Sequence, residues 1–296
     1  MSQNLLNEFP EIIQCNEPLA MHTWFQLGGN AEFYAEPESW ETLIRLLQYA
    51  SSNAIPVRIL GAGSNILVRS TEVAGLVIHA GENLPVTLEI DGSTVRVSGN
   101  VPLGRLVTSA VRAGLGGIED LVGIPGTVGG ALHGNIGTDS TDIGQFLKSV
   151  KVAAMDGTVS TLDSSEIIFG YHQSSLADVV VMEAVFEFRE EDPLELAQRM
   201  QKRWIVRKAS QPMGHQGSGR IFRNSSESGW SASELVAQVG MAGTRVGGAS
   251  IFERHTNYIV TTPECTPNDI LRLARLVQEQ VLEHTGVELA LELEVW

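Results

Sequence analysis

Four glycines surround one proline in the segment Gly123-Ile124-Pro125-Gly126-Thr127-Val128-Gly129-Gly130-Ala131. Helices and strands disfavour this composition, so we expect a loop built for a ligand that comes close to its backbone. Glycine tolerates positive φ and lets successive N–H groups converge on an anion, while Pro125 fixes one φ angle. The segment predicts a ligand that carries phosphates, with a tight structural turn as the alternative.

A second glycine-containing segment, Gly61-Ala62-Gly63-Ser64-Asn65, follows the apolar stretch at residues 57–60. Its small and polar residues are therefore expected to line a phosphate or a sugar where a strand ends. A further Gly-Gly pair lies at Gly28-Gly29. Together the three glycine-rich positions favour a large, phosphate-bearing cofactor.

The composition is that of an ordinary globular protein. The chain has 296 residues, of which 43% are hydrophobic and 19% charged, which allows about two domains with real cores. Its start has no basic region, and no apolar run reaches the length of a membrane span, so we expect a soluble, cytoplasmic protein. Cys15 and Cys265 have no metal-ligand spacing, and neither a disulfide framework nor a metal site is expected.

The net charge of −15 argues against nucleic acid as a partner, because that polymer is bound by many Lys and Arg side chains. Basic residues are nevertheless concentrated between residues 199 and 254. Those at 199–208 are interpreted as the solvated face of a helix. Arg220, Arg223, Arg245 and Arg254 lie among glycines and strand-like residues, where we favour an anion site.

Hydrophobic periodicity divides the chain into three regions. Around residues 24–78, short strands alternate with a helix whose apolar side chains have helical spacing: Trp40, Leu43, Ile44 and Leu47. Around residues 86–188, two hairpins are predicted at Asp91-Gly92 and Asp156-Gly157, with a helix over 103–113 between them.

The third region opens with Glu191-Asp192-Pro193 and a basic helix that extends to about Lys208. A later helix is predicted to begin after Thr266 as N-cap and to end at Gly286. A final strand is expected over 287–296.

The order of motifs along nearly the whole chain resembles the UDP-N-acetylenolpyruvoylglucosamine reductase family in its shorter form. The motifs that carry the resemblance lie at residues 24–31, 60–68, 123–131, 169–171, 211–212, 247–249, 255 and 292–295. The resemblance implies an α+β fold with a two-part FAD-binding domain of the vanillyl-alcohol oxidase (PCMH) type over 21–190, in two α/β lobes at about 21–78 and 79–190. A smaller α/β substrate-binding domain is expected over 191–296.

The resemblance also implies a reaction. NADPH would reduce FAD and leave, and an enolpyruvyl nucleotide sugar would then be reduced in peptidoglycan precursor synthesis, by a cytoplasmic monomer. Two alternatives stay open: a diverged paralogue that binds FAD and a nucleotide sugar with weak or no reductase activity, and an oxidase or dehydrogenase of the wider flavin fold. In the family, the FAD pyrophosphate rests on backbone amides of the two glycine-rich segments, here Gly61 to Asn65 and Gly123 to Gly130.

The catalytic motifs depart from the family at two positions. The family's proton donor is the Ser or Cys of Gly-Ser/Cys-x-Phe-Lys, and the matching stretch Gly219-Arg220-Ile221-Phe222-Arg223 places Arg220 there. A guanidinium stays protonated at neutral pH and is a poor general acid. Ser218 is a possible substitute donor, with an ordinary turn serine as the alternative.

The second departure is His172, which stands in Tyr171-His172-Gln173-Ser174 where the family has an enolate-stabilising arginine. An imidazolium could partly replace that arginine, with a surface histidine as the alternative. Glu294 matches the family's catalytic glutamate. The stretch at 138–142 also lacks the family's usual residues in a loop that approaches the flavin.

Four residues are expected at the substrate on the strength of the resemblance. They are Tyr171, Arg207, Arg223 and Asn224, and the alternative for each charged one is a surface charge. Arg223 replaces the lysine of the family motif and retains its charge.

Overall fold

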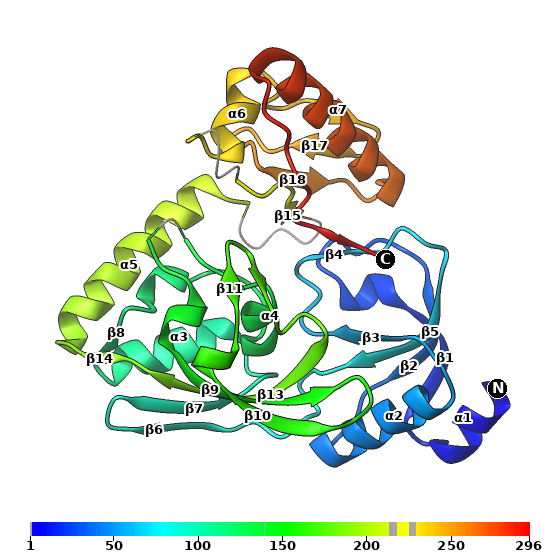
Figure 1. Cartoon of the computed structure of the whole chain (residues 1–296). Coiled ribbons are helices and arrows are strands. Elements are labelled where there is room, and N and C mark those ends of the chain that lie inside the picture. Colours follow the sequence, from blue (N-terminus) through cyan, green and yellow to red (C-terminus); the bar gives the residue numbers. More distant parts are fainter. Residues whose placement is uncertain (1, 139, 213–217, 225–228) are drawn as a thin grey trace. The chain divides into compact units, whose positions relative to one another are not determined.

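A computed structural model describes residues 2–138, 140–212, 218–224 and 229–296 (Figure 1). The chain forms two compact units. Unit 1 contains Met1–Glu17, Ala31–Ala62 and Ala74–Ile205, and unit 2 contains Pro18–Asn30, Gly63–Val73 and Val206–Trp296. None of the described helices combines the length and the apolar character needed to cross a membrane.

The first lobe of unit 1 is a four-stranded sheet with two helices. The strand order is β1 (Ile13–Pro18), β2 (Asn30–Ala35), β5 (Glu72–His79) and β3 (Val57–Leu60), and β3 and β5 are parallel. The helices are α1 (Ser2–Glu8) and α2 (Trp40–Ser52). Ser39 caps α2 by accepting a hydrogen bond from the N–H of Thr42, and Leu43, Leu46 and Leu47 are buried. The helix predicted from apolar spacing is confirmed.

The second lobe of unit 1 is built on a five-stranded antiparallel sheet. Its order is β10 (Val159–Asp163), β9 (Leu147–Ala154), β13 (Val179–Glu187), β7 (Thr94–Ser98) and β6 (Leu88–Asp91). Both predicted Asp-Gly hairpins are confirmed, since β6 pairs with β7 and β9 with β10. Helices α3 (Leu103–Arg112) and α4 (Val128–His133) contribute buried side chains to the core of this lobe.

Shorter elements complete unit 1. They are the two-stranded pairs β8 (Leu115–Gly116) with β14 (Arg189–Glu190) and β11 (Phe169–Gly170) with β12 (Gln173–Ser174), and the 3₁₀ turns Glu119–Leu121, Ile143–Phe146 and Ser164–Glu166. Helix α5 (Pro193–Ser210) begins in this unit. On α5, Arg199 forms ion pairs with Glu119 and Glu191, and Arg203 with Asp120. These basic side chains of the helix surface therefore have acidic protein partners.

Unit 2 contains a four-stranded antiparallel sheet and two helices. The strand order is β15 (Ser218–Arg220), β18 (Tyr258–Thr261), β17 (Ala249–Ile251) and β16 (Arg245–Val246), with α6 (Ala232–Gln238) and α7 (Pro267–Thr285). As predicted, Thr266 caps α7 and Gly286 ends it with φ of 71°. The 3₁₀ turn Leu19–His22 also belongs to this unit.

The units are discontinuous in sequence, unlike the continuous ranges 21–190 and 191–296 expected for the domains. Two early segments cluster with the C-terminal part because Phe25 and Leu67 are buried in the core of unit 2. In addition, β4 (Ile66–Leu67) pairs in parallel with β19 (Glu294–Val295).

The expected continuous strand over 287–296 is wrong, because this stretch changes its pairing partner. Ala290 and Glu292 bond to the backbone of Arg223 and Ile221, and the chain then moves to β4. Only β19 is a regular strand here.

Candidate functional site

The two predicted glycine-rich segments meet at one pocket of unit 1. The pocket has a volume of about 330 Å³ and is lined by Gly61 and Ala62 from the first segment and by Gly126 and Thr127 from the second. A Cβ atom on Gly61 would lie 3.2 Å from Oγ1 of Thr127, so the segments are close neighbours. This pocket therefore joins two stretches that lie far apart in the sequence.

Other residues of the second segment shape the turn. Gly123 and Gly126 have φ of 79° and 124°, conformations that favour glycine. The N–H of Gly129 donates to Gly99 O at 2.7 Å, and that of Gly130 donates to Thr127 Oγ1 at 3.1 Å. The amides of Gly129 and Gly130 are thus engaged within the protein.

The expectation that the whole segment is non-helical is wrong at its end. Helix α4 begins at Val128, with Thr127 as its N-cap. Because the cap hydroxyl accepts the bond from Gly130, helical geometry is stabilised despite two glycines. Ile124 and Pro125 precede this turn, and the N–H of Ile124 donates to Leu121 O.

The remaining part of the first segment belongs to unit 2. Gly63 has φ of 63°, and a Cβ there would clash with the backbone of His22. Ser64 follows it. Asn65 donates from Nδ2 to Glu292 O at 3.0 Å, and its own carbonyl accepts from the N–H of Glu294. Asn65 therefore organises the C-terminal segment within unit 2.

Tyr171 and His172 form the turn between β11 and β12. Their ring centroids lie 4.3 Å apart, and His172 adopts a left-handed φ of 50°. Both line a second pocket of unit 1, of about 580 Å³, together with Thr138, Thr141 and Asp142. The loop at 138–142 and His172, which both differ from the family motifs, thus line one pocket. Asp139 lies outside the described residues.

Arg220 in unit 2 is paired with the carboxylate of Glu292, which was not among the predicted site residues. Its Nε lies 3.0 Å from Oε2 of Glu292, whose side chain is only 9% exposed. Arg220 ends β15 opposite Tyr258. The backbone of Ser218 begins the same strand, while its side chain lies outside the described part of the chain.

Electrostatics around Arg220 affect two neighbouring side chains. Burial lowers the pKa of His255, and the positive charge of Arg220 lowers it further. Burial raises the pKa of Tyr258, an effect that Arg220 and Arg207 oppose. The rings of His255 and Tyr258 meet edge to face at 4.9 Å. Arg220, Glu292, Tyr258 and His255 therefore form one polar cluster.

Glu294, the glutamate expected from the motif, is exposed, and its Oε1 accepts a hydrogen bond from Trp296 Nε1 at 2.9 Å. Glu292 is the acidic residue beside Arg220. The Glu-x-Glu spacing in the sequence offers two acidic residues at this position. They differ in burial, because the side chain of Glu292 is nearly buried and Glu294 is exposed.

The expected substrate residues of unit 2 have different surroundings. Nε of Arg223 is buried and has no hydrogen-bond partner among the described residues. Asn224 Oδ1 accepts from the N–H of Ala232, the first residue of α6. Arg207 lies in the last turn of α5, close enough to Tyr258 to influence its pKa.

Comparison with known proteins matches the full length of the chain. It is 34% identical over 299 residues to a UDP-N-acetylenolpyruvoylglucosamine reductase of Rhodopirellula baltica, covering 100% of this chain and 97% of that protein. It is 38% identical over 290 residues to UDP-N-acetylenolpyruvoylglucosamine reductase 2 of Symbiobacterium thermophilum, covering 97% and 93%. The chain belongs to the UDP-N-acetylenolpyruvoylglucosamine reductase family.

Family models and a solved structure agree with this membership. Residues 31–163 match an FAD binding domain, and residues 211–296 match the C-terminal domain of UDP-N-acetylenolpyruvoylglucosamine reductase. The crystal structure of the reductase from Thermus caldophilus has a TM-score of 0.80 at 34% identity, covering 96% of this chain and 98% of that one. The α+β fold and the recognised family are therefore confirmed.

Gly126→Ala is expected to weaken FAD binding by about 10- to 100-fold. A side chain at φ of 124° costs about 1–3 kcal/mol of strain and would shift the pocket lining. Titration calorimetry with FAD would measure the loss. The control is Gly92→Ala, a left-handed glycine in the β6–β7 turn with open space around it. Equal FAD affinity in wild type and Gly126→Ala would remove Gly126 from the cofactor site.

Acidification should destabilise the protein partly through His255. Because the folded protein lowers this pKa below the usual value of 6.5, the unfolded chain binds a proton more readily below that pH. The free energy of unfolding should therefore fall as the pH drops through 6.5, and fall less in His255→Gln. Urea unfolding of the wild type and of His255→Gln, at about pH 7.5 and about pH 5.5, would measure how much stability each protein loses on acidification. An equal loss of stability on acidification in the wild type and in His255→Gln would contradict this role of His255.

Proposed function

We propose that this chain is an FAD-dependent reductase that uses NADPH to convert UDP-N-acetylglucosamine enolpyruvate to UDP-N-acetylmuramate. The observation that carries the proposal is identity of 34–38% over almost the entire chain to reductases of this name. The match to an FAD binding domain includes both glycine-rich segments at one pocket. The proposal includes a monomer acting in the cytoplasm on two small molecules, NADPH and the nucleotide sugar.

The pocket between the glycine-rich segments is suited to a dinucleotide cofactor. Gly61 and Gly126 let the backbone approach a ligand closely, and Thr127 fixes the turn beside them. FAD, when bound, supplies hydride transfer between NADPH and the substrate. The role of these residues is to hold the cofactor and keep its phosphates on backbone amides.

In unit 2, Arg220 and Arg223 are the proposed ligands of the substrate's anionic groups. Arg223 has a buried, unsatisfied Nε among the described residues, and such a donor is costly unless a ligand accepts from it. Arg220 carries a permanent charge beside Glu292 and can stabilise negative charge that develops on the substrate. Asn224 and Arg207 are the other proposed substrate residues of unit 2, and Tyr171 is the one proposed from unit 1.

Proton delivery is the step for which this chain is least equipped. Arg220 cannot give up a proton near neutral pH, so the proposal assigns it binding and charge stabilisation. Ser218 and Glu294 are retained as catalytic candidates, and His172 as the replacement for the family's arginine. Substrate reduction should therefore be slower than cofactor reduction.

Anaerobic half-reactions test the proposed function. NADPH should bleach the flavin absorbance of the purified protein, and the enolpyruvyl nucleotide sugar should restore it with formation of UDP-N-acetylmuramate, detected by mass spectrometry. Bleaching that the sugar nucleotide never reverses, even on long incubation, would contradict the reductase assignment.

A further inference from the structure

The pocket at the glycine-rich segments also contains hydrogen-bond acceptors. Three acceptor-bearing side chains line this pocket of about 330 Å³: those of Glu36, Glu82 and Asn100. His79, Gly81, Asn83 and Pro102 complete the lining beside the two segments, and all of these residues belong to unit 1. Carboxylates repel phosphate, whereas backbone amides attract it. The amides and the acceptors of this pocket therefore suit different parts of one ligand, an anionic part and a part that donates hydrogen bonds.

Asn100 presents an acceptor whose orientation is fixed by the protein. The residue is only 4% exposed, and its Nδ2 donates to Gly81 O at 3.1 Å and to Leu84 O at 2.9 Å. These two bonds leave Oδ1, which is buried and has no hydrogen-bond partner within the described residues. A buried acceptor without a donor is costly, and a ligand donor in this pocket would satisfy it.

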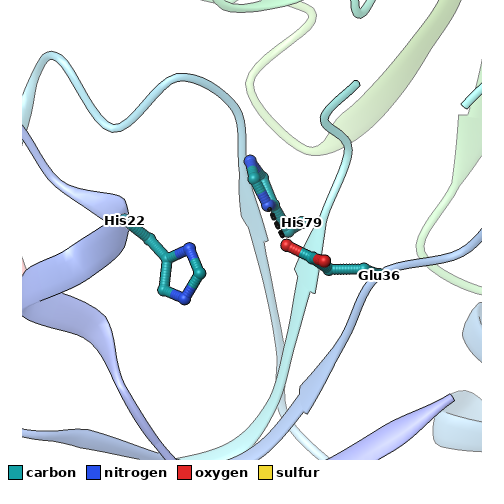
Figure 2. A group of neighbouring side chains, drawn as sticks. All are labelled: His22, Glu36 and His79. Carbon is teal, nitrogen blue, oxygen red and sulfur yellow. Dashed lines mark hydrogen bonds and ion pairs between the residues drawn. The ribbon is translucent and has the colours of Figure 1, made fainter. Parts of the chain in front are cut away.

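Side chains of unit 1 hold Glu36 in the pocket. Its Oε1 accepts from Tyr34 Oη at 2.7 Å and lies 2.8 Å from His79 Nδ1, and its Oε2 accepts from Asn83 Nδ2 at 3.2 Å. Figure 2 shows the bond between Glu36 and His79; His22, also drawn there, belongs to unit 2. Burial raises the pKa of Tyr34, and the nearby Glu36 raises it further, so that Tyr34 stays a donor to this carboxylate.

We propose that Glu36 and Asn100 bind the adenosine end of FAD by accepting hydrogen bonds from its donor groups. This inference rests on the proposed FAD cofactor. Adenosine offers the exocyclic amino group and two ribose hydroxyls as donors. The flavin half offers one ring N–H and the ribityl hydroxyls, all of which FMN retains. A fixed carboxylate next to an amide-lined phosphate site is also how other dinucleotide sites bind ribose.

The test compares FAD with FMN, which has the flavin but lacks adenosine monophosphate. Flavin is removed from the full-length protein, and binding of each compound is followed by calorimetry and by quenching of flavin fluorescence. We expect Glu36→Gln to weaken FAD binding by about 10- to 100-fold and to leave FMN binding unchanged. The matched control is Glu38→Gln, two residues away and exposed, which should bind both compounds like the wild type.

Three results would overturn the inference: unchanged FAD affinity in Glu36→Gln, an equal loss of FAD and FMN affinity in that variant, or wild-type protein that binds FMN as tightly as FAD. The last measurement needs no variant and so does not depend on the folding of Glu36→Gln. Wild-type protein that binds neither compound would instead contradict the cofactor assignment itself, and with it this inference.

Discussion

Arg220→Ser should accelerate reoxidation of the NADPH-reduced enzyme by the enolpyruvyl substrate by about 10²- to 10⁴-fold, the usual contribution of a positioned general acid. A serine hydroxyl at this position can donate a proton, whereas the guanidinium of Arg220 cannot do so near neutral pH. Reduction by NADPH should change little, because that half-reaction does not use the acid. Stopped-flow absorbance of the flavin would measure each half-reaction separately.

Two further variants separate proton donation from charge. Arg220→Ala removes the charge without adding a donor and should not accelerate reoxidation. Replacing Arg220 also removes the ion-pair partner of the nearly buried Glu292 and leaves its carboxylate uncompensated. The double variant Arg220→Ser with Glu292→Gln controls for this effect. The two residues are in contact, and their effects need not add. Slower reoxidation in both serine variants would show that Arg220 itself is needed for the transfer.

Asn257→Leu should lower the free energy of unfolding by about 2–6 kcal/mol, because two buried backbone groups lose their partners at about 1–3 kcal/mol each. Asn257 is 1% exposed; its Oδ1 accepts from the N–H of Phe222 at 2.9 Å, and its Nδ2 donates to Phe222 O at 2.8 Å. Phe222 is itself buried, and it lies in the sequence between Arg220 and Arg223. The side-chain amide therefore fixes the segment that carries both arginines.

Urea denaturation monitored by circular dichroism would measure this loss. Asn268→Leu, on the exposed first turn of α7, is the control and should change stability by no more than about 0.5 kcal/mol. Wild-type stability in Asn257→Leu would mean that the Phe222 backbone finds other partners.

Local signals in the sequence were sufficient for several elements. The Asp-Gly turns at 91–92 and 156–157 favour tight hairpins through the backbone freedom of glycine, and the structure contains both. Thr266 and Gly286 bound α7 because capping involves only residues within one helical turn. Such signals depend on neighbours in sequence, and no distant contact is needed to interpret them.

The glycine-rich segments were recognised from sequence because close backbone approach requires glycine. The order of these and the other motifs along the chain also indicated the family. Their meeting in one pocket, however, depends on how residues 61–62 and 126–127 are brought together by the fold of unit 1. The helix that begins at Val128 was missed, because a side-chain cap on Thr127 outweighs the low helix propensity of Gly129 and Gly130.

Burial and long-range pairing decided the remaining features. Glu292 and Glu294 are equivalent by spacing, yet Glu292 is the one that packs against Arg220, while Glu294 is exposed on β19. Asn100 belongs to no recognised motif, and its proposed role in binding depends on the carbonyls of Gly81 and Leu84, which orient its side-chain amide. The sequence by itself determined the family, the cofactor class and the local elements. Only the tertiary structure selected which polar side chains are buried and face one another, because burial depends on contacts between residues that are distant in the chain.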